Sequence, residues 1–356
     1  MNNKHVDELM KIIKGEISSH KVYLMELGID PVIIKEYIET YLGLKWVDYS
    51  KSNLENRKKY WHNMIAFYDA LGYVTIRVSN AFNFVMNIKN NNNRGWIDQN
   101  GKIHDEQTFN EYPWPSINDL DLWDYDYVAS ILPSHMGMLV CIHGGIFEMI
   151  SEYLIGFEDL CFMRYDNPVL LKTIINKVGS LLLDAYKVIF KKVKRIVGVF
   201  QGDDFGFTEG LLFDKEFFIE YILPWHQELI NLTHQYNGVY IMHSCGNLRD
   251  LKDEIMKLKI DAKHSFEDKG WSVIDFSNEF GKKVSIIGGV DVDKLTRLPL
   301  DELKKYCHNI LTKCHPFGRY IYGSGNSIPN YVSLERFLVM LGEAKKYEQE
   351  IMNEKI

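Results

Sequence analysis

Residues 238–265, GVYIMHSCGNLRDLKDEIMKLKIDAKHS, combine two short strand patterns with one helical pattern between them. The first strand pattern is rich in β-branched and aromatic residues and ends at a polar cluster that contains a glycine. An amphipathic helical pattern follows over 248–258, and a second short strand pattern begins at Ala262. This order predicts a βαβ unit with parallel strands.

The same alternation recurs along the chain from residue 73 onward. The predicted strands are 73–78, 139–143, 195–201, 238–243, 262–265, 284–288 and 319–322. The predicted helices are 6–15, 31–41, 54–71, 147–160, 168–192, 215–236, 248–258, 299–314 and 334–350. Repeated strand–helix order predicts an α/β fold with a parallel sheet that is covered on its faces by helices.

A closed (β/α)₈ barrel and an open doubly wound sheet are both compatible with this order. Polar and glycine-rich clusters follow nearly every predicted strand, at 144–145, 202–204, 243–247, 288–291 and 323–326. A barrel gathers chemistry at the carboxyl ends of all its strands, whereas an open sheet concentrates it at one switch point. We therefore predict one TIM-barrel domain over 1–356, with a helical N-terminal extension over 1–70 and the barrel over 71–356.

Composition narrows the class of protein. The net charge of −7 and the lack of a basic stripe argue against nucleic-acid binding. No stretch approaches ~18 uninterrupted apolar residues, so no membrane span is expected. The first 16 residues are polar and charged, without an export signal, and the five cysteines are scattered without framework spacing. These features predict a soluble cytoplasmic enzyme in a reducing compartment.

His243 and Cys245 form the sharpest chemical feature of the sequence. In an extended segment, residues i and i+2 project to the same side, so the imidazole and the thiol should face a common point. Zinc binds neutral imidazole nitrogen and thiolate sulfur, and Gly246 would let the backbone turn beneath such a site. An isolated His-x-Cys pair is more often a hydrogen-bonded histidine beside a buried cysteine, so the zinc interpretation depends on a third ligand.

A catalytic zinc site needs about three protein ligands and one open position. His264, at the end of the next predicted strand, is chemically the best third ligand. Glu267, Ser324 and the more distant Glu228 are the alternatives, and the sequence alone does not choose among the four.

Other polar residues at predicted strand ends could serve substrate or cofactor. Adjacent residues on a strand face opposite ways, so at most one of Asp203 and Asp204 should enter the barrel mouth, while the other caps a turn. We assign catalytic roles to Asp203 and Glu267. The glycine-rich turns could bring backbone N–H groups to an anionic cofactor or substrate, and we assign that role to Gly289, Asp291, Gly323, Ser324 and Asn326.

Several of these segments, in this order, resemble the uroporphyrinogen decarboxylase superfamily. The resemblance covers about the last two thirds of the chain and rests on Tyr112-Pro-Trp-Pro, Gly202-Asp-Asp-Phe-Gly206, the helix with Pro224, His243-Ser-Cys-Gly-Asn247, Gly288-Gly-Val-Asp291 and Gly323-Ser-Gly-Asn-Ser-Ile-Pro-Asn-Tyr331. It implies a (β/α)₈ barrel and one of two chemistries, which are metal-free decarboxylation of porphyrinogens and zinc-dependent methyl transfer with a cobamide.

The sequence is more similar to the methyltransferases of that superfamily. The decarboxylases carry an arginine-rich N-terminal segment for their carboxylated substrate, whereas the first 150 residues here contain only Arg57, Arg77 and Arg94. His243 and Cys245 match the zinc pair of the methyltransferases. The methylcobamide:coenzyme M enzymes add a cysteine from the last strand-end loop, where this chain has Ser324.

The resemblance therefore implies a zinc enzyme that exchanges a methyl group between a small methylated substrate and a corrinoid (cobalamin) carried by a corrinoid-binding partner protein. We favour demethylation of an O-, N- or S-methyl compound, for example O-demethylation of a methoxylated aromatic, because the third cysteine of the thiol-methylating enzymes is missing. A metal-free decarboxylase, a methylcobamide:thiol methyltransferase and a non-catalytic barrel that binds a corrinoid or tetrapyrrole are the alternatives.

Overall fold

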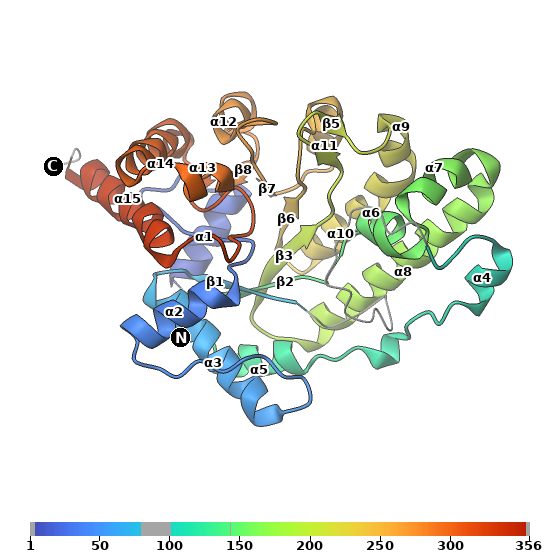
Figure 1. Ribbon diagram of the computed structural model, residues 1–356, viewed down its shortest axis with the longest axis horizontal. Helices are drawn as coiled ribbons and strands as arrows, with labels where there is room; N and C mark the ends of the chain where they lie inside the picture. Colours follow the sequence, from blue (N-terminus) through green and yellow to red (C-terminus); the bar gives the residue numbers. More distant parts are fainter. Residues whose placement is uncertain (1–3, 80–100, 143, 354–356) are drawn as a thin grey trace.

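The computed structural model describes residues 4–79, 101–142 and 144–353, and its centre is a curled parallel sheet (Figure 1). All seven predicted strands are confirmed, with ends that differ by up to three residues. They are β1 (Thr75–Val78), β2 (Gly137–Val140), β3 (Ile196–Gly202), β6 (Val239–His243), β7 (Ala262–His264), β8 (Ser285–Ile287) and β9 (Tyr320–Ile321). A short antiparallel hairpin, β4 (Gly206–Phe207) and β5 (Gly210–Leu211), follows β3.

The strands pair in chain order, β1-β2-β3-β6-β7-β8-β9, and every neighbouring pair in this sheet is parallel. A doubly wound sheet would reverse its strand order at a switch point, and this sheet has no reversal. The prediction of a barrel-like α/β fold is confirmed to that extent. Within the described residues the sheet has seven strands and does not close with an eighth.

Helices surround the sheet (Figure 1). They are α1 (Lys4–Lys14), α2 (Pro31–Tyr41), α3 (Leu54–Ala70), α4 (Glu106–Glu111), α5 (Trp123–Ile131), α6 (Ile146–Glu148), α7 (Phe157–Asp166), α8 (Pro168–Lys192), α9 (Lys215–Phe217), α10 (Leu223–Gln235), α11 (Lys252–Lys257), α12 (Val273–Phe280), α13 (Val292–Arg297), α14 (Leu300–Cys314) and α15 (Leu334–Asn353). Among the described residues, none of these helices has the length and apolar character needed to cross a membrane.

Local chemistry explains why α8 matches its predicted bounds. The Asn167 side chain accepts a hydrogen bond from Leu170 N, and Pro168 occupies the first turn, where its missing N–H costs nothing. The predicted helix over 147–160 was wrong in its extent. There the chain forms α6, then a π-helical turn over Met149–Leu154, and starts α7 only at Phe157. The sequence prediction also missed α4, α5, α12 and α13.

The inner face of the sheet packs against the N-terminal helix. Alternate strand residues Leu139, Phe200, Ile241 and Ile287 form one buried cluster with side chains from α1, namely Leu9, Ile12 and Ile13. Burying a large aliphatic or aromatic side chain stabilises the fold by about 1.5–3 kcal/mol. The α1 helix lies at the amino ends of the strands, where Ile13 O accepts from Ser285 Oγ and from Arg319 Nη2, and its apolar side chains cover the inner face there.

The segment between α1 and α2 runs parallel to the last strand. Met25 N donates to Tyr322 O at 3.0 Å, and Tyr322 N donates to Tyr23 O at 2.8 Å. Parallel bridges join Leu24 to Tyr322 and Ile29 to Ile328. The predicted N-terminal extension is thus more than a set of helices, because part of it lies along the outer edge of β9 and continues the hydrogen-bonding of the sheet.

A buried ion pair connects α3 to the start of α5. Arg57 Nε and Nη2 donate to the two carboxylate oxygens of Asp124, each at 2.8 Å, and both residues are less than one-tenth exposed. Trp61 Nε1 and Tyr49 OH donate to the same carboxylate at 2.7 and 2.8 Å. The Asp124 carboxylate thus accepts four hydrogen bonds. A buried charge is stable only when it is paired and hydrogen-bonded in this way.

We predict that Asp124→Ala lowers the free energy of unfolding by about 3–5 kcal/mol, because it leaves Arg57 as a buried charge without its main partner. Urea denaturation followed by circular dichroism measures the loss. The matched control is Asp184→Ala, which removes an exposed pair with Lys187 and should cost less than about 1 kcal/mol. Equal losses in the two variants would contradict the argument.

Candidate metal centre

Three different donor atoms meet at the carboxyl ends of β3 and β6. His243 Nε2 lies 3.5 Å from Cys245 Sγ and 3.5 Å from Asp204 Oδ1. The ligand atoms of all three residues lie within 4.8 Å of one another. His243 is buried, whereas Asp204 and Cys245 are partly exposed. The group therefore combines one buried donor residue with two that are partly exposed to solvent.

Strand geometry and one glycine bring these side chains together. Gly202 at the end of β3 pairs in register with His243 at the end of β6, so the residues that follow both strands start from the same level. Asp204 Oδ1 accepts a hydrogen bond from Cys245 N at 2.8 Å. Gly246 then turns with φ of +83°, where an added Cβ would lie 2.2 Å from the Gly206 backbone. The predicted convergence of His243 and Cys245 is therefore present.

A chain of hydrogen bonds determines which nitrogen of His243 faces this group. His264 Nε2 lies 3.2 Å from the carbonyl oxygen of Ser324, which only accepts, so this nitrogen carries the proton. His264 Nδ1 is then the acceptor in its 2.7 Å contact with His243 Nδ1, provided that His264 is neutral. Burial lowers the pKa of His264 well below its usual value, which favours the neutral form. The lone pair of His243 Nε2 consequently faces Cys245 and Asp204.

The electrostatics of the group favour a cation. Burial, followed by the charges of Lys263 and Arg77, lowers the pKa of His243 to about 3, so the ring is neutral at physiological pH. Burial also raises the pKa of the Asp204 carboxyl and of the Cys245 thiol, and the Asp204 charge adds to the rise at Cys245. The Asp204 charge thus disfavours the Cys245 thiolate, whereas hydrogen bonds from Cys245 lower the pKa of Asp204 and partly offset the effect of its burial.

The sulfur of Cys245 has two further neighbours. Asn326 Nδ2 donates to Sγ at 3.2 Å, and Ser265 Oγ donates to it at 3.7 Å. Buried Lys263 adds a charge beside the group, and its Nζ donates to Ser265 O at 2.6 Å. Burial lowers the pKa of Lys263 to about 7, against the opposing effects of Cys245, Asp204 and Glu267. These donors suit a sulfur that carries negative charge.

The structure gives Asp203 and Asp204 the opposite roles to those predicted. Asp203 is fully buried and accepts hydrogen bonds from the backbone N–H groups of Ile146, Phe147 and Glu148, at the start of α6. His226 Nε2 lies 2.9 Å from the same carboxylate. One aspartate faces the group and the other caps a turn, as expected, but the one that faces the group is Asp204.

Within the described residues, the other predicted ligands are not members of the three-residue donor group. Both ring nitrogens of His264 are engaged, so it supports His243 from behind. Ser324 is fully buried, and its hydroxyl contacts the Glu26 carboxylate and the carbonyl of Asn326. Glu228 lies exposed on α10. Glu267 is half-buried, and burial together with the charges of Asp291 and Asp204 raises its pKa.

The glycine-rich turns make close contacts within the protein. Asp291 caps α13 by accepting from Lys294 N at 3.1 Å, and it also accepts from Asp268 N at 2.9 Å. An added Cβ on Gly323 would lie 2.1 Å from Met25 O. Ser324 N and Gly325 N donate to Glu26 and Val290. Gly289, with φ of +120°, lies against Val273. Of the five predicted cofactor-binding residues, Asn326 is the one with a hydrogen bond to a member of the donor group, Cys245.

Sequence reasoning did not single out Lys263 or Glu26. Lys263 had a signal, because a lysine between Ala262 and His264 in a buried strand is unusual. Glu26 had none, because its partner Ser324 lies 298 residues away in the chain. His143 and Arg94, from the predicted strand over 139–143 and the loop over 90–94, lie outside the described residues.

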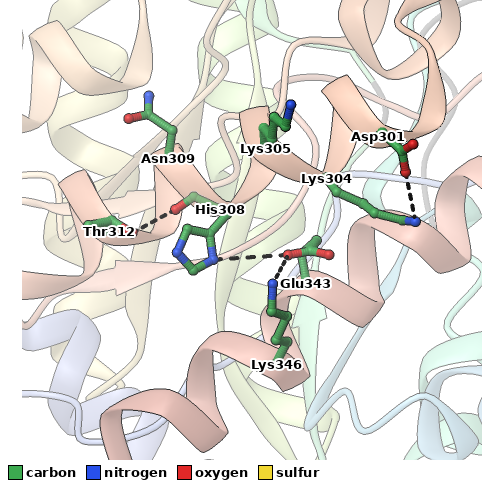
Figure 2. Close-up of a pocket in the computed structure, with 8 residues that line it drawn as sticks. All are labelled: Asp301, Lys304, Lys305, His308, Asn309, Thr312, Glu343 and Lys346. Atoms are coloured by element: carbon green, nitrogen blue, oxygen red, sulfur yellow. Dashed lines mark hydrogen bonds and ion pairs between the residues drawn. The ribbon is translucent and has the colours of Figure 1, made fainter. Parts of the chain in front are cut away.

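A surface pocket lies elsewhere, between α14 and α15 (Figure 2). Figure 2 shows Glu343 between Lys346 and His308, at 3.8 Å from Lys346 Nζ and 4.0 Å from His308 Nδ1. Lys304 pairs with Asp301 on the same rim. The lining comes only from the two helices and includes none of the residues that follow the strands, so this pocket is separate from the donor group.

The residues that meet here fit zinc. Neutral imidazole nitrogen, cysteine sulfur and carboxylate oxygen are the ligands that Zn²⁺ takes in proteins, and three of them leave a fourth position open for water or substrate. A ligating histidine normally engages its other ring nitrogen with a protein acceptor, as His243 does with His264. The two separations of 3.5 Å from His243 Nε2 match the spacing of ligands about 2.0–2.3 Å from one ion, and the third separation is within 4.8 Å.

Two solved structures resemble this chain to different degrees. A methyltransferase from Methanosarcina mazei has a similar structure, with a TM-score of 0.64 at 14% identity over 95% of this chain and 97% of that chain. A B12-independent methionine synthase from Shewanella sp. W3-18-1 gives a TM-score of 0.44 at 14% identity, over 65% of this chain and 67% of that chain. No curated protein sequence matches significantly.

The sequence itself supplies the family. The model of the uroporphyrinogen decarboxylase (URO-D) family matches residues 136–347, which is more than half of the chain. The match includes β2 to β9 and all three members of the donor group. The protein therefore belongs to the uroporphyrinogen decarboxylase (URO-D) family.

Proposed function

We propose that this protein is a zinc-dependent methyltransferase that moves a methyl group between a small methylated substrate and a corrinoid carried by a partner protein. The observation that carries the proposal is the convergence of His243 Nε2, Cys245 Sγ and Asp204 Oδ1 within 4.8 Å of one another. In our proposal Asp204 replaces His264 as the third ligand. The similar fold of a methyltransferase supports the class of enzyme only at the level of the fold.

The fixed tautomer of His243 distinguishes this group from a pair of ordinary buried histidines. Here Nδ1 is paired with His264, and the neighbours of Nε2 are the Cys245 sulfur and the Asp204 carboxylate, each at 3.5 Å. A divalent cation would bind all three donor atoms together.

In the proposed reaction the protein's residues bind, orient and balance charge. A bound zinc ion would supply Lewis acidity to the O, N or S atom that releases the methyl group. His243, Cys245 and Asp204 would hold the ion, and the donors Asn326 and Ser265 would limit the charge on the sulfur. Lys263 would compensate negative charge near the leaving heteroatom, and Glu267, with its raised pKa, would carry a proton to it.

The remaining alternatives receive less support. A decarboxylase of a polycarboxylated tetrapyrrole needs free basic groups, but Arg57 is engaged by Asp124 and Arg77 donates to Leu27 O and Phe200 O. These are the arginines of the first 150 residues within the described part of the chain. The Ser324 hydroxyl is occupied by Glu26, which disfavours a third ligand from the last loop and so favours demethylation over thiol methylation.

We predict that the purified protein contains about one zinc per chain by metal analysis, and that His243→Ala, Cys245→Ala and Asp204→Ala each lower zinc affinity by at least about 10-fold, because each removes one of three ligands. Glu228→Ala, on the exposed face of α10, should leave zinc binding unchanged. Retention of stoichiometric zinc by both the His243 and the Cys245 variants would contradict the proposed site.

We predict that the zinc-loaded protein methylates added Co(I) cobalamin from at least one compound in a panel of O-, N- and S-methyl donors, as measured by the absorbance change of the corrinoid. Chelation of the metal should abolish the transfer, and restored zinc should recover it, because the heteroatom then loses and regains its Lewis acid. Decarboxylation of a porphyrinogen by the metal-free protein would favour the competing function.

A further inference from the structure

Glu26 is a buried carboxylate that lies outside the strands that form the donor group. It lies in the segment between α1 and α2, is 4% exposed, and accepts a hydrogen bond from Ser324 N at 3.0 Å and another from the Ser324 hydroxyl. Tyr73 OH donates to its other oxygen at 3.4 Å. Burying a carboxylate is costly, and the burial raises its pKa to about 7. Such a cost indicates a role beyond filling space.

The loop that contains Ser324 contacts His264 through a backbone carbonyl and Cys245 through a side-chain amide. The carbonyl oxygen of Ser324 accepts from His264 Nε2 at 3.2 Å, and His264 in turn fixes the tautomer of His243. The side-chain amide of Asn326 donates to Cys245 Sγ at 3.2 Å. One loop of four residues, Gly323 to Asn326, therefore orients both the imidazole and the sulfur.

The backbone around this loop leaves it little room to move independently of Glu26. Gly323 lies against Met25 O, where an added Cβ would be 2.1 Å away, and Gly325 lies equally close to Phe266 O. Gly325 N also donates to Val290 O at 2.6 Å. The segment around Met25 thus packs directly against the Gly323–Asn326 loop. Within this packing, the Glu26 carboxylate accepts the hydrogen bonds that hold Ser324.

We propose that Glu26 is a positioning residue for the metal centre, and that it acts through Ser324 on both His243 and Cys245. This inference rests on the proposed zinc site. It assigns to the N-terminal segment, about 220 residues before His243 and Cys245 in the chain, the task of keeping the imidazole and the sulfur directed at one ion. Supporting groups of this kind typically change metal affinity by about 10–100-fold when they are removed.

The test compares two substitutions of nearly equal size. Glu26→Gln keeps an oxygen that accepts from Ser324, whereas Glu26→Leu removes every hydrogen bond at that point. Each metal-free protein is titrated with Co(II), and the absorption bands that report cobalt–thiolate bonding and coordination geometry are recorded. Zinc affinity follows from competition. Glu343→Leu is the matched control, because it removes a carboxylate of similar burial, 7% exposed, from the pocket between α14 and α15 (Figure 2).

We expect Glu26→Leu to weaken zinc binding by about 10–100-fold and to change the cobalt–thiolate band, while Glu26→Gln and Glu343→Leu stay within about threefold of the wild type. A wild-type affinity and spectrum in Glu26→Leu overturns the inference and leaves the zinc site intact. A wild-type protein that binds neither metal overturns the proposed function itself. If Glu26→Leu does not fold, the smaller Glu26→Ala, which also removes the carboxylate that accepts from Ser324 N and Oγ, decides the matter, since an unchanged cobalt spectrum in that variant also overturns the inference.

Discussion

The hydrogen bond between the two buried imidazoles, His243 and His264, is the interaction on which the site depends. It links β6 to β7, and the backbone acceptor at Ser324 determines its direction. Because a carbonyl oxygen cannot donate, one proton assignment follows through both rings. The outcome is an unprotonated Nε2 that faces a thiol and a carboxylate, which is the form of histidine that binds a metal.

The fold makes this arrangement possible because parallel strands in chain order end at the same edge. The three donors lie at the ends of two neighbouring strands: Asp204 after β3, His243 at the end of β6, and Cys245 after it. The loop after β9 contacts this group through Asn326, which donates to Cys245 Sγ. The N-terminal region supports both ends of the strands, since α1 packs at their amino ends while Glu26 holds the loop after the carboxyl end of β9. We propose on this basis that the chain works as one domain, with its N-terminal residues as an integral part.

The sequence predicted those features that depend on local rules. Alternation along a strand placed His243 and Cys245 on one side, and the strand–helix pattern located all seven strands. It chose Asp203 instead of Asp204, which was wrong, because the outcome depends on the start of α6, more than 50 residues earlier, whose N–H groups bind Asp203. It also could not find Glu26, whose role exists only through a contact between distant ends of the chain.

X-ray absorption at the zinc edge of the wild-type protein reports the atoms that bind the ion. We expect one sulfur neighbour at about 2.3 Å and nitrogen or oxygen neighbours at about 2.0–2.2 Å, in a four-coordinate site. A spectrum with no sulfur in the coordination sphere would contradict this expectation, because Cys245 is then not a ligand. Two sulfur neighbours would contradict it as well. The proposed site contains one cysteine, Cys245, and its third ligand is the Asp204 carboxylate.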